Sequence, residues 1–288
     1  MFLIDQILIL LAAIGFALLD LFRKLLAGRV RVVPLLFLLT AGVIPVYTIW
    51  FLWDGAPAPD AAYWAPALAS VAINVLANLM YLRAVHLGEF SRTIPLLSLT
   101  PVFTTVLAVP MLGEVPGVRQ AFGILLVVLG AIWLQKGATT GTGDHRGRFP
   151  PSAWMMLGVA LLWSSTTPLD KLAMQHATAS LHATVLHLGI AGSLGVWLQA
   201  RGELGRVRDV RSSPWLLLGA LCASAVALAA QLMALERVFA AFLETLKRGW
   251  GGLAALILGW LVFSEPVTWR KSLAVAVMIG GVAMLLLP

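Results

Sequence analysis

Long apolar runs separated by short polar connections dominate this 288-residue sequence. A transmembrane helix needs about 20 consecutive, mostly apolar residues, and ten runs reach roughly that length. Charged residues make up only 11% of the chain, against about 25% in soluble domains, so a water-soluble core cannot hide this much apolar surface. The sequence predicts an all-α integral membrane protein with ten transmembrane helices. The runs are residues 3–24, 32–53, 62–84, 92–112, 117–136, 152–174, 180–200, 214–235, 239–263 and 268–287.

The two halves of the chain resemble one another. Residues 112–134 match residues 263–285 at a shift of 151, which aligns Glu114 with Glu265. Each half holds five predicted helices. Because five is an odd number, the second half enters the membrane from the opposite side. A 5+5 inverted repeat of this kind is the architecture of many secondary transporters.

The longest polar stretch, residues 135–152, lies between the two halves. We therefore predict a first five-helix repeat over residues 1–138, a cytoplasmic linker over 139–151 and a second five-helix repeat over 152–288. The boundary rests on the loss of apolar character and on the Gly- and Thr-rich composition of this stretch.

Basic residues predict the orientation of the helices. The net charge is +7, but the basic residues gather at the ends of the apolar runs, which argues against nucleic acid as a partner. Most of the 20 Lys and Arg residues lie near the connections after the first, third, fifth, seventh and ninth helices. The positive-inside rule places these connections in the cytoplasm and both termini outside. We expect a multi-pass protein of the inner (plasma) membrane.

Three charged residues, Glu244, Lys247 and Arg248, lie inside the ninth apolar run. They share one helical face with four small residues, because their positions follow the i, i+3, i+4 and i+7 spacing. The small residues of this stripe are Gly251, Gly252, Ala255 and Gly259.

A charge at membrane depth costs about 2.5–3.5 kcal/mol on insertion scales and usually faces water or a partner. Glu244 can neutralise only one of the two adjacent cations, so one positive charge remains for a water-filled cavity or an anionic ligand. The alternative is that Lys247 and Arg248 extend to the membrane interface, with Glu244 as a structural counter-ion.

Two corresponding helices contain residues that weaken an α-helix. The fourth run holds Pro95 and Pro101, and the ninth holds Gly249, Gly251 and Gly252. Transporter binding sites often form where corresponding helices of two repeats are interrupted, so we expect a site there. Pro and Gly are also frequent in ordinary transmembrane helices, which is the alternative interpretation.

Further polar residues within apolar runs are candidates for lining the cavity. Asn74, Asn78 and Tyr81 follow one face of the third helix, Trp163 precedes a Ser/Thr run in the sixth, and Gln231 lies in the eighth. Each of them either contacts substrate or forms hydrogen bonds between helices.

Two aspartates at helix ends, Asp20 and Asp170, are candidates for binding a coupling ion or proton, and the alternative is an interfacial ion pair with Lys24 or Lys171. His182 and His187 are five residues apart on one predicted helix, a poor spacing for metal ligands, so we assign them to packing and predict no metal site and no cofactor.

Residues 246–268, "LKRGWGGLAALILGWLVFSEPVT", resemble the Lys-Arg helix of plant sugar-phosphate/phosphate translocators and related nucleotide-sugar carriers. The ten-helix plan, the Trp163-Ser164-Ser165 motif followed by Lys171, and the "GE-P" and "SEP" helix ends resemble the EamA branch of the drug/metabolite transporter superfamily. The resemblance implies transport of small metabolites by alternating access.

In the translocators, the Lys-Arg pair binds substrate phosphate together with a lysine of the fourth helix. The resemblance therefore implies that Lys247 and Arg248 bind substrate. The position of the third cation falls near Leu97, so that cation is missing here. Arg92 is a possible substitute, although its alternative role is that of a flanking cytoplasmic charge. The missing cation favours a singly charged or zwitterionic substrate.

These features predict a secondary transporter that moves a small polar or amphipathic metabolite with an anionic group, amino acid-like or an organophosphate, as an exporter or exchanger. A lipid flippase of the same fold is the alternative. A membrane-embedded enzyme is the least favoured class, because the sequence has no recognisable catalytic motif. We expect membrane lipid and a small-molecule substrate as partners, and a monomer or homodimer.

Overall fold

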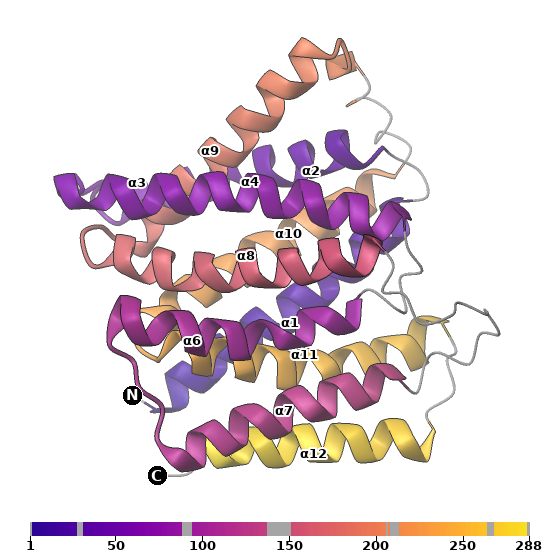
Figure 1. Ribbon diagram of the computed structural model, residues 1–288. Coiled ribbons are helices and arrows are strands. Elements are labelled where there is room, and N and C mark those ends of the chain that lie inside the picture. Colours follow the sequence, from indigo (N-terminus) through magenta and orange to yellow (C-terminus); the bar gives the residue numbers. More distant parts are fainter. Residues whose placement is uncertain are drawn as a thin grey trace. The chain divides into compact units, whose positions relative to one another are not determined.

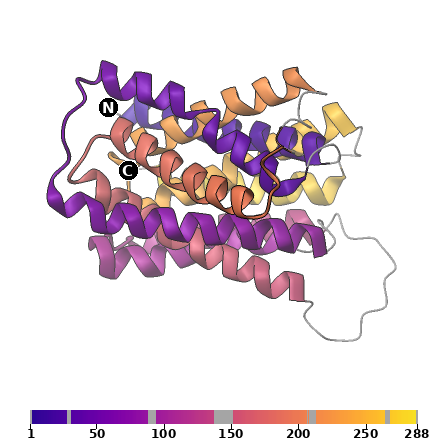
Figure 2. The same cartoon turned by 90° about the horizontal axis from the view of Figure 1, so that it is seen from above.

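The computed structural model describes residues 2–27, 31–87, 94–136, 151–205, 207, 213–263 and 268–286. Within these ranges every regular element is a helix (Figures 1 and 2). The elements are α1 (Phe2–Ala27), α2 (Val32–Ala41), α3 (Ile44–Trp53), η1 (Ala61–Tyr63), α4 (Trp64–Leu87), η2 (Ile94–Leu99), α6 (Thr100–Leu112), α7 (Val118–Lys136), α8 (Pro151–Met174), α9 (Ala179–Ala200), α10 (Pro214–Leu235), α11 (Ala240–Phe263) and α12 (Trp269–Leu286).

The described residues form ten helical spans, five in each half of the sequence, when α2 is joined to α3, η1 to α4 and η2 to α6. The predicted ten-helix, all-α membrane fold is confirmed. Five described segments are long and apolar enough to cross a membrane by themselves: Leu3–Arg23, Val32–Trp53, Ala61–Tyr81, Ala179–Ala200 and Pro214–Leu235. Large apolar side chains such as Ile49, Leu68 and Val196 are exposed on them, as expected where lipid rather than water surrounds the helices.

Among the described residues, three spans depart from regular α-helix: the second at Gly42, the third in its first three residues, which form η1, and the fourth in η2. Gly42 ends α2, and Pro45 lies in the first turn of α3, where a missing N–H breaks no helical hydrogen bond. The fourth span begins as a 3₁₀ helix and becomes α-helical at Thr100, with Pro101 in the first turn of α6. The expected weakening of the fourth helix is thus present.

The matching break expected in the ninth helix is wrong. Helix α11 is α-helical from Ala240 to Phe263, across all of its glycines. Gly249 has a packing role instead, because a Cβ at this position would lie 2.5 Å from Cγ2 of Val282 in α12. Glycine here allows two backbones to approach closely, and the interruption of the α-helix is confined to one member of the repeat pair.

The described chain divides into two compact units, and each unit takes helices from both halves of the sequence. Unit 1 comprises residues 1–76 and 169–237, and unit 2 comprises residues 77–168 and 238–288. The compact units are therefore different from the predicted sequence repeats, 1–138 and 152–288. The predicted linker, 139–151, lies outside the described residues except for Pro151.

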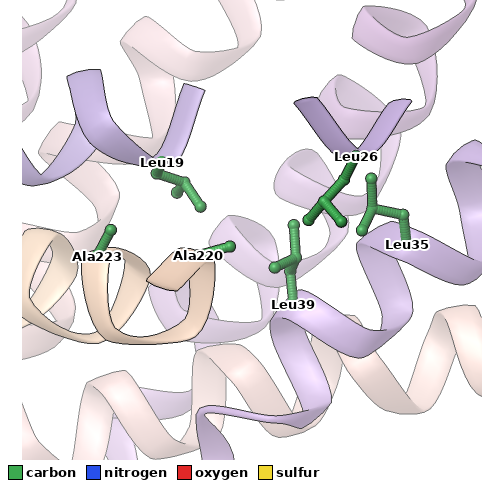
Figure 3. Close-up of a cluster of buried hydrophobic side chains, with 6 residues drawn as sticks. All are labelled: Leu19, Leu26, Leu35, Leu39, Ala220 and Ala223. Atoms are coloured by element: carbon green, nitrogen blue, oxygen red, sulfur yellow. The ribbon is translucent and has the colours of Figure 1, made fainter. Parts of the chain in front are cut away.

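Unit 1 is built around the contact between α1 and α10. Gly15 allows the approach, because a Cβ there would lie 2.8 Å from Cβ of Ala227. Nearby, α1, α2 and α10 share a buried apolar cluster in which leucines from α1 and α2 cover two alanines of α10 (Figure 3). The cluster consists of Leu19, Leu26, Leu35, Leu39, Ala220 and Ala223.

Unit 2 is built around the contact between α7 and α12, which lie side by side (Figure 1). Gly123 and Gly281 face one another so closely that a Cβ on Gly281 would lie 2.7 Å from the carbonyl oxygen of Gly123. Two turns further along α7, Gly130 packs against Met278. Small residues at such contacts allow the van der Waals packing that holds membrane helices together.

Candidate functional sites

The start of α11 is fixed by a carboxylate from the connection between α6 and α7. Glu114 is only 6% exposed, and its Oε2 accepts a hydrogen bond from the backbone N–H of Ala240 at 2.6 Å. A carboxylate at this position satisfies one of the N–H groups that a helix leaves unpaired at its N-terminus. Glu114, which is not among the predicted site residues, therefore positions the helix that carries the three charged residues.

Glu244 and Lys247 neutralise one another. Oε1 of Glu244 lies 2.6 Å from Nζ of Lys247 one turn later, and the two side chains are 8% and 14% exposed. The same oxygen accepts a hydrogen bond from the hydroxyl of Thr167 in α8 at 3.1 Å. The predicted counter-ion role of Glu244 thus has a specific partner, Lys247.

Arg248 is held by the first residue of α6. Its Nε donates a hydrogen bond to Oγ1 of Thr100 at 3.0 Å, while the hydroxyl of Thr100 donates its own proton to the carbonyl of Leu97 at 2.8 Å. In the described part of the chain, no carboxylate lies within ion-pair distance of Arg248. The contact at Nε leaves the two terminal nitrogens of the guanidinium, which together match the two oxygens of a carboxylate or phosphate.

Side-chain hydroxyls link α6 and α8 at Thr100, the residue that holds this arginine. Oγ of Ser164 lies 3.0 Å from the carbonyl oxygen of Thr100 and 2.6 Å from that of Ala160. Pro168 lacks the N–H that would bond the carbonyl of Ser164, and the hydroxyl of Thr104 lies 3.5 Å from that oxygen. Because Pro101 and Pro168 have no N–H, the carbonyls of Leu97 and Ser164 lack their helical donors. The hydroxyls of Thr100 and Thr104 lie within hydrogen-bond distance of these two carbonyls. We call Thr100, Thr167, Glu244, Lys247 and Arg248 the helix-11 site.

The aromatic candidates of unit 2 form a packed pair. The rings of Tyr81 and Trp163 are 5.2 Å apart at 40°, and both pack against the buried cluster that includes Leu97. Leu97 is 6% exposed, so the position at which the translocators have a third cation is an apolar core position here. Asn78 is half-buried in the same unit, and Arg92 lies outside the described residues.

Unit 1 contains a second polar cluster, centred on Asp170. Its Oδ1 lies 3.0 Å from Nε2 of His182 in α9 and accepts a hydrogen bond from the hydroxyl of Ser70 in α4. On the other side of the imidazole, Nδ1 of His182 lies 3.2 Å from the hydroxyl of Tyr63. Asn74 donates to the carbonyl and to Oγ of Ser70, at 3.1 and 3.3 Å. We call these five residues the Asp170 cluster.

The assignment of His182 to packing is therefore wrong, because both ring nitrogens contact polar groups. Asp170 turns to His182 rather than to Lys171, since adjacent residues on a helix do not face each other. His182 and Tyr63 give no periodic signal in the sequence, because they lie on other elements than Asp170, His182 on the next helix and Tyr63 on η1. His187, by contrast, packs its ring 4.9 Å from that of Tyr47, as expected.

The remaining predicted residues are spread over unit 1. Asp20 is largely exposed and pairs with Arg23 one turn later at 3.3 Å, the geometry of a surface ion pair. The side chain of Lys24, its predicted partner, lies outside the described residues. Gln231 is buried in α10. An open groove of about 490 Å³ lies on α9 in this unit, and its lining includes none of the predicted site residues.

Comparison with known proteins identifies the family. The profile of the EamA-like transporter family matches residues 3–135 and again residues 151–287. The chain belongs to the EamA-like transporter family. As an EamA protein it is a membrane transporter of the drug/metabolite transporter superfamily, a family of transporters rather than enzymes, and the resemblance to the EamA branch is confirmed.

The structural comparison agrees with this EamA fold. A solved structure titled "Crystal structure of protein" matches with a TM-score of 0.74 and 17% sequence identity, over 98% of this chain and 95% of the other. At this identity, the likeness concerns the fold alone. No curated protein matches the sequence.

Proposed function

We propose that this EamA protein is a secondary transporter of a small metabolite carrying one anionic group, amino acid-like or an organophosphate, and that Arg248 binds that group. The protein would act by alternating access in the inner (plasma) membrane as an exporter or exchanger. The observation that supports the proposal is the half-buried guanidinium of Arg248 in unit 2, held at Nε by Thr100.

Arg248 is suited to anion binding by its surroundings. Its side chain is half-buried, so a bound anion would be partly shielded from competing water and salt. Thr100 holds Nε at 3.0 Å, which orients the planar guanidinium and lowers the entropy cost of capturing a ligand. A charge-assisted bidentate contact of this type is among the stronger hydrogen bonds in proteins.

The charge balance of the helix-11 site supports a singly charged group. Glu244 and Lys247 form an ion pair and together contribute no net charge, which leaves the one positive charge of Arg248. A doubly charged phosphate would retain a net negative charge at this site, whereas a carboxylate or a phosphate diester would be neutralised. For this reason we favour carboxylates and singly charged phosphates over sugar phosphate dianions.

A ligand screen followed by transport tests the proposal. Purified protein is first heated with amino acids, sugar phosphates, nucleotides and lipids, because a ligand that binds only the folded state raises the unfolding temperature. Each hit is then measured by counterflow of the radiolabelled compound in proteoliposomes. Stabilisation by lipids alone, without counterflow of any soluble compound, would reject the metabolite proposal and support a flippase.

The role of Arg248 is tested with a matched pair of arginine variants. Arg248→Gln is expected to lower counterflow about 10- to 100-fold, the equivalent of the roughly 1.5–3 kcal/mol of a charged hydrogen bond. Arg248→Lys should retain part of the activity. Arg201→Gln is the control, because Arg201 is exposed and stacks on Trp197 with its guanidinium carbon 5.0 Å from the ring centre. Equal losses in the Arg248 and Arg201 variants would exclude a specific role for Arg248.

A further inference from the structure

We propose that Asp170 and His182 form a proton-binding site that gains or loses one proton during the transport cycle. The two residues come from α8 and α9 of unit 1, and Oδ1 of Asp170 lies 3.0 Å from Nε2 of His182. Both are ionisable, and the ligand of the site is a single proton shared between a carboxylate and an imidazole.

Burial makes the charge of this pair costly to change. Asp170 is 3% exposed, and His182, Ser70 and Tyr63 are each 0% exposed. With one proton on the pair, the carboxylate and the imidazolium neutralise each other. Without it, a negative charge remains in a poorly solvated place, which is strongly unfavourable. Burial therefore favours the proton-bound pair, and water must reach the cluster before the proton can leave.

The surrounding hydroxyls satisfy both protonation states. When His182 is neutral and donates from Nε2 to Asp170, its bare Nδ1 accepts a hydrogen bond from Tyr63, 3.2 Å away. When His182 is an imidazolium, Nδ1 carries a proton and the oxygen of Tyr63 accepts it, because a phenol both donates and accepts. Ser70 donates to Asp170 in either state.

Other ionisable groups lie near the pair and set its local field. Tyr63 contacts it from η1, Lys171 follows Asp170 on α8, and His187 lies on α9 five residues after His182. At the N-terminal end of α9, the carboxylate of Asp54 accepts a hydrogen bond from Ser180 at 2.7 Å. Glu236 follows α10, and its carboxyl interacts with the backbone of Ala179. Neutral side chains, Ser70 and Asn74, cover the pair from α4.

The coupling of this proton to transport rests on the function proposed above. If release requires water, the pair holds its proton while it is buried and exchanges it when water reaches it from one side of the membrane. The proton then crosses in the same direction as the solute or in the opposite direction, depending on the side from which water reaches the pair after the solute has bound. Proton binding itself is independent of the substrate, so the two ideas are tested separately.

Nitrogen NMR of histidine tests proton binding without any substrate. The protein is labelled with ¹⁵N-histidine, placed in nanodiscs and titrated between about pH 5 and 9, the range in which histidine charges in proteins. His182→Asn assigns the signal among the five histidines. We expect the His182 signal to change from imidazolium to neutral within this range. An unchanged signal at every pH would overturn the proposal.

Variants of the partners separate proton binding from structural support. In Asp170→Asn, the midpoint of the His182 titration should move to lower pH by at least about one unit. The reason is that the carboxylate that stabilises the imidazolium is gone. Ser70→Ala, a milder change, should shift it in the opposite direction, because the carboxylate loses a donor and becomes a better proton acceptor. Arg201→Gln is the control, because Arg201 is exposed at the other end of α9, and it should leave the midpoint within a few tenths of a unit. Identical His182 midpoints in wild type, Asp170→Asn and Ser70→Ala would overturn the proposal.

Coupling is then measured with the solute that wild-type protein carries in counterflow. In Asp170→Asn we expect the ratio of proton-gradient-driven accumulation to counterflow to fall at least tenfold, because counterflow needs no net proton movement. An unchanged ratio would reject coupling. If wild type carries no member of the panel, the function proposal fails, and the NMR titration still decides whether the proton site exists.

Discussion

Thr100 and Arg248 are 148 residues apart in the sequence, yet their side chains are joined by a 3.0 Å hydrogen bond from Nε to Oγ1. Thr100 is the first residue of α6, where the 3₁₀ helix η2 ends. The irregular start of one helix therefore orients a cation on another.

Removing the hydroxyl of Thr100 should weaken solute binding through Arg248. For Thr100→Val we expect the KM for counterflow to rise about tenfold, with kcat changed less than twofold. Without the hydroxyl, Arg248 is no longer oriented before the solute binds, and the binding free energy becomes less favourable by roughly 1.5 kcal/mol. Thr100→Ser keeps the oxygen and should restore the KM. Equal KM values in the Val and Ser variants would show that the hydroxyl does not act on Arg248.

Breaking the Glu244–Lys247 pair should destabilise the protein more than removing both charges. Lys247→Met leaves the 6% exposed Glu244 without its nearest cation, and such losses cost about 3–5 kcal/mol in buried pairs. We expect a clear fall in the unfolding temperature in nanodiscs. The double variant Glu244→Gln/Lys247→Met should recover most of it. A double variant that is less stable than Lys247→Met would contradict a simple neutralising role.

Two adjacent glycines of α12 should respond differently to substitution. A Cβ on Gly281 would lie 2.7 Å from the carbonyl oxygen of Gly123, whereas one on Gly280 meets no atom within 4 Å. We expect Gly281→Ala to lower stability by about 1–3 kcal/mol through overpacking of α7 against α12. Gly280→Ala should be neutral or slightly stabilising, since alanine has the higher helix propensity. The comparison uses thermal unfolding of both variants under one condition.

Restoring the cation of the translocators at Leu97 should not create a sugar phosphate transporter. Leu97 is 6% exposed and packs with Ala84, Met156 and Val159. A lysine there would place a charge in an apolar cluster, at a cost of about 2.5–3.5 kcal/mol on insertion scales. We expect Leu97→Lys to be less stable than Leu97→Met and to gain no counterflow of glucose 6-phosphate. A gain of that activity would mean that position 97 is open to substrate.

The membrane fold was predictable from the sequence because a bilayer imposes a simple rule. Each span must be helical, apolar and about 20 residues long, so the run of residues 214–235 alone predicts the bounds of α10, Pro214–Leu235. The same rule does not predict where a span departs from regular α-helix. Glycines of α11 were expected to interrupt it, but Gly249 packs against Val282, and a sequence does not tell a packing glycine from a helix-breaking one.

The candidate sites were only partly predictable. The charge stripe of Glu244, Lys247 and Arg248 lies on one helix, so its spacing alone predicts a shared face and the pairing of Glu244 with a cation one turn away. Which cation is paired with Glu244 depends on side chains from other helices, here Thr167 and Thr100. The Asp170 cluster joins four elements and follows no period, so the sequence leaves His182 indistinguishable from a packing residue.

Ten membrane spans in two related halves follow from the sequence, because hydrophobicity, length and the spacing of charges are local properties of the chain. The pairing of Lys247 with Glu244, the contact of Arg248 with Thr100 and that of Asp170 with His182 become visible only in the folded protein. Hydrogen bonds and ion pairs act over about 3 Å, and the packing of the helices determines which side chains come that close.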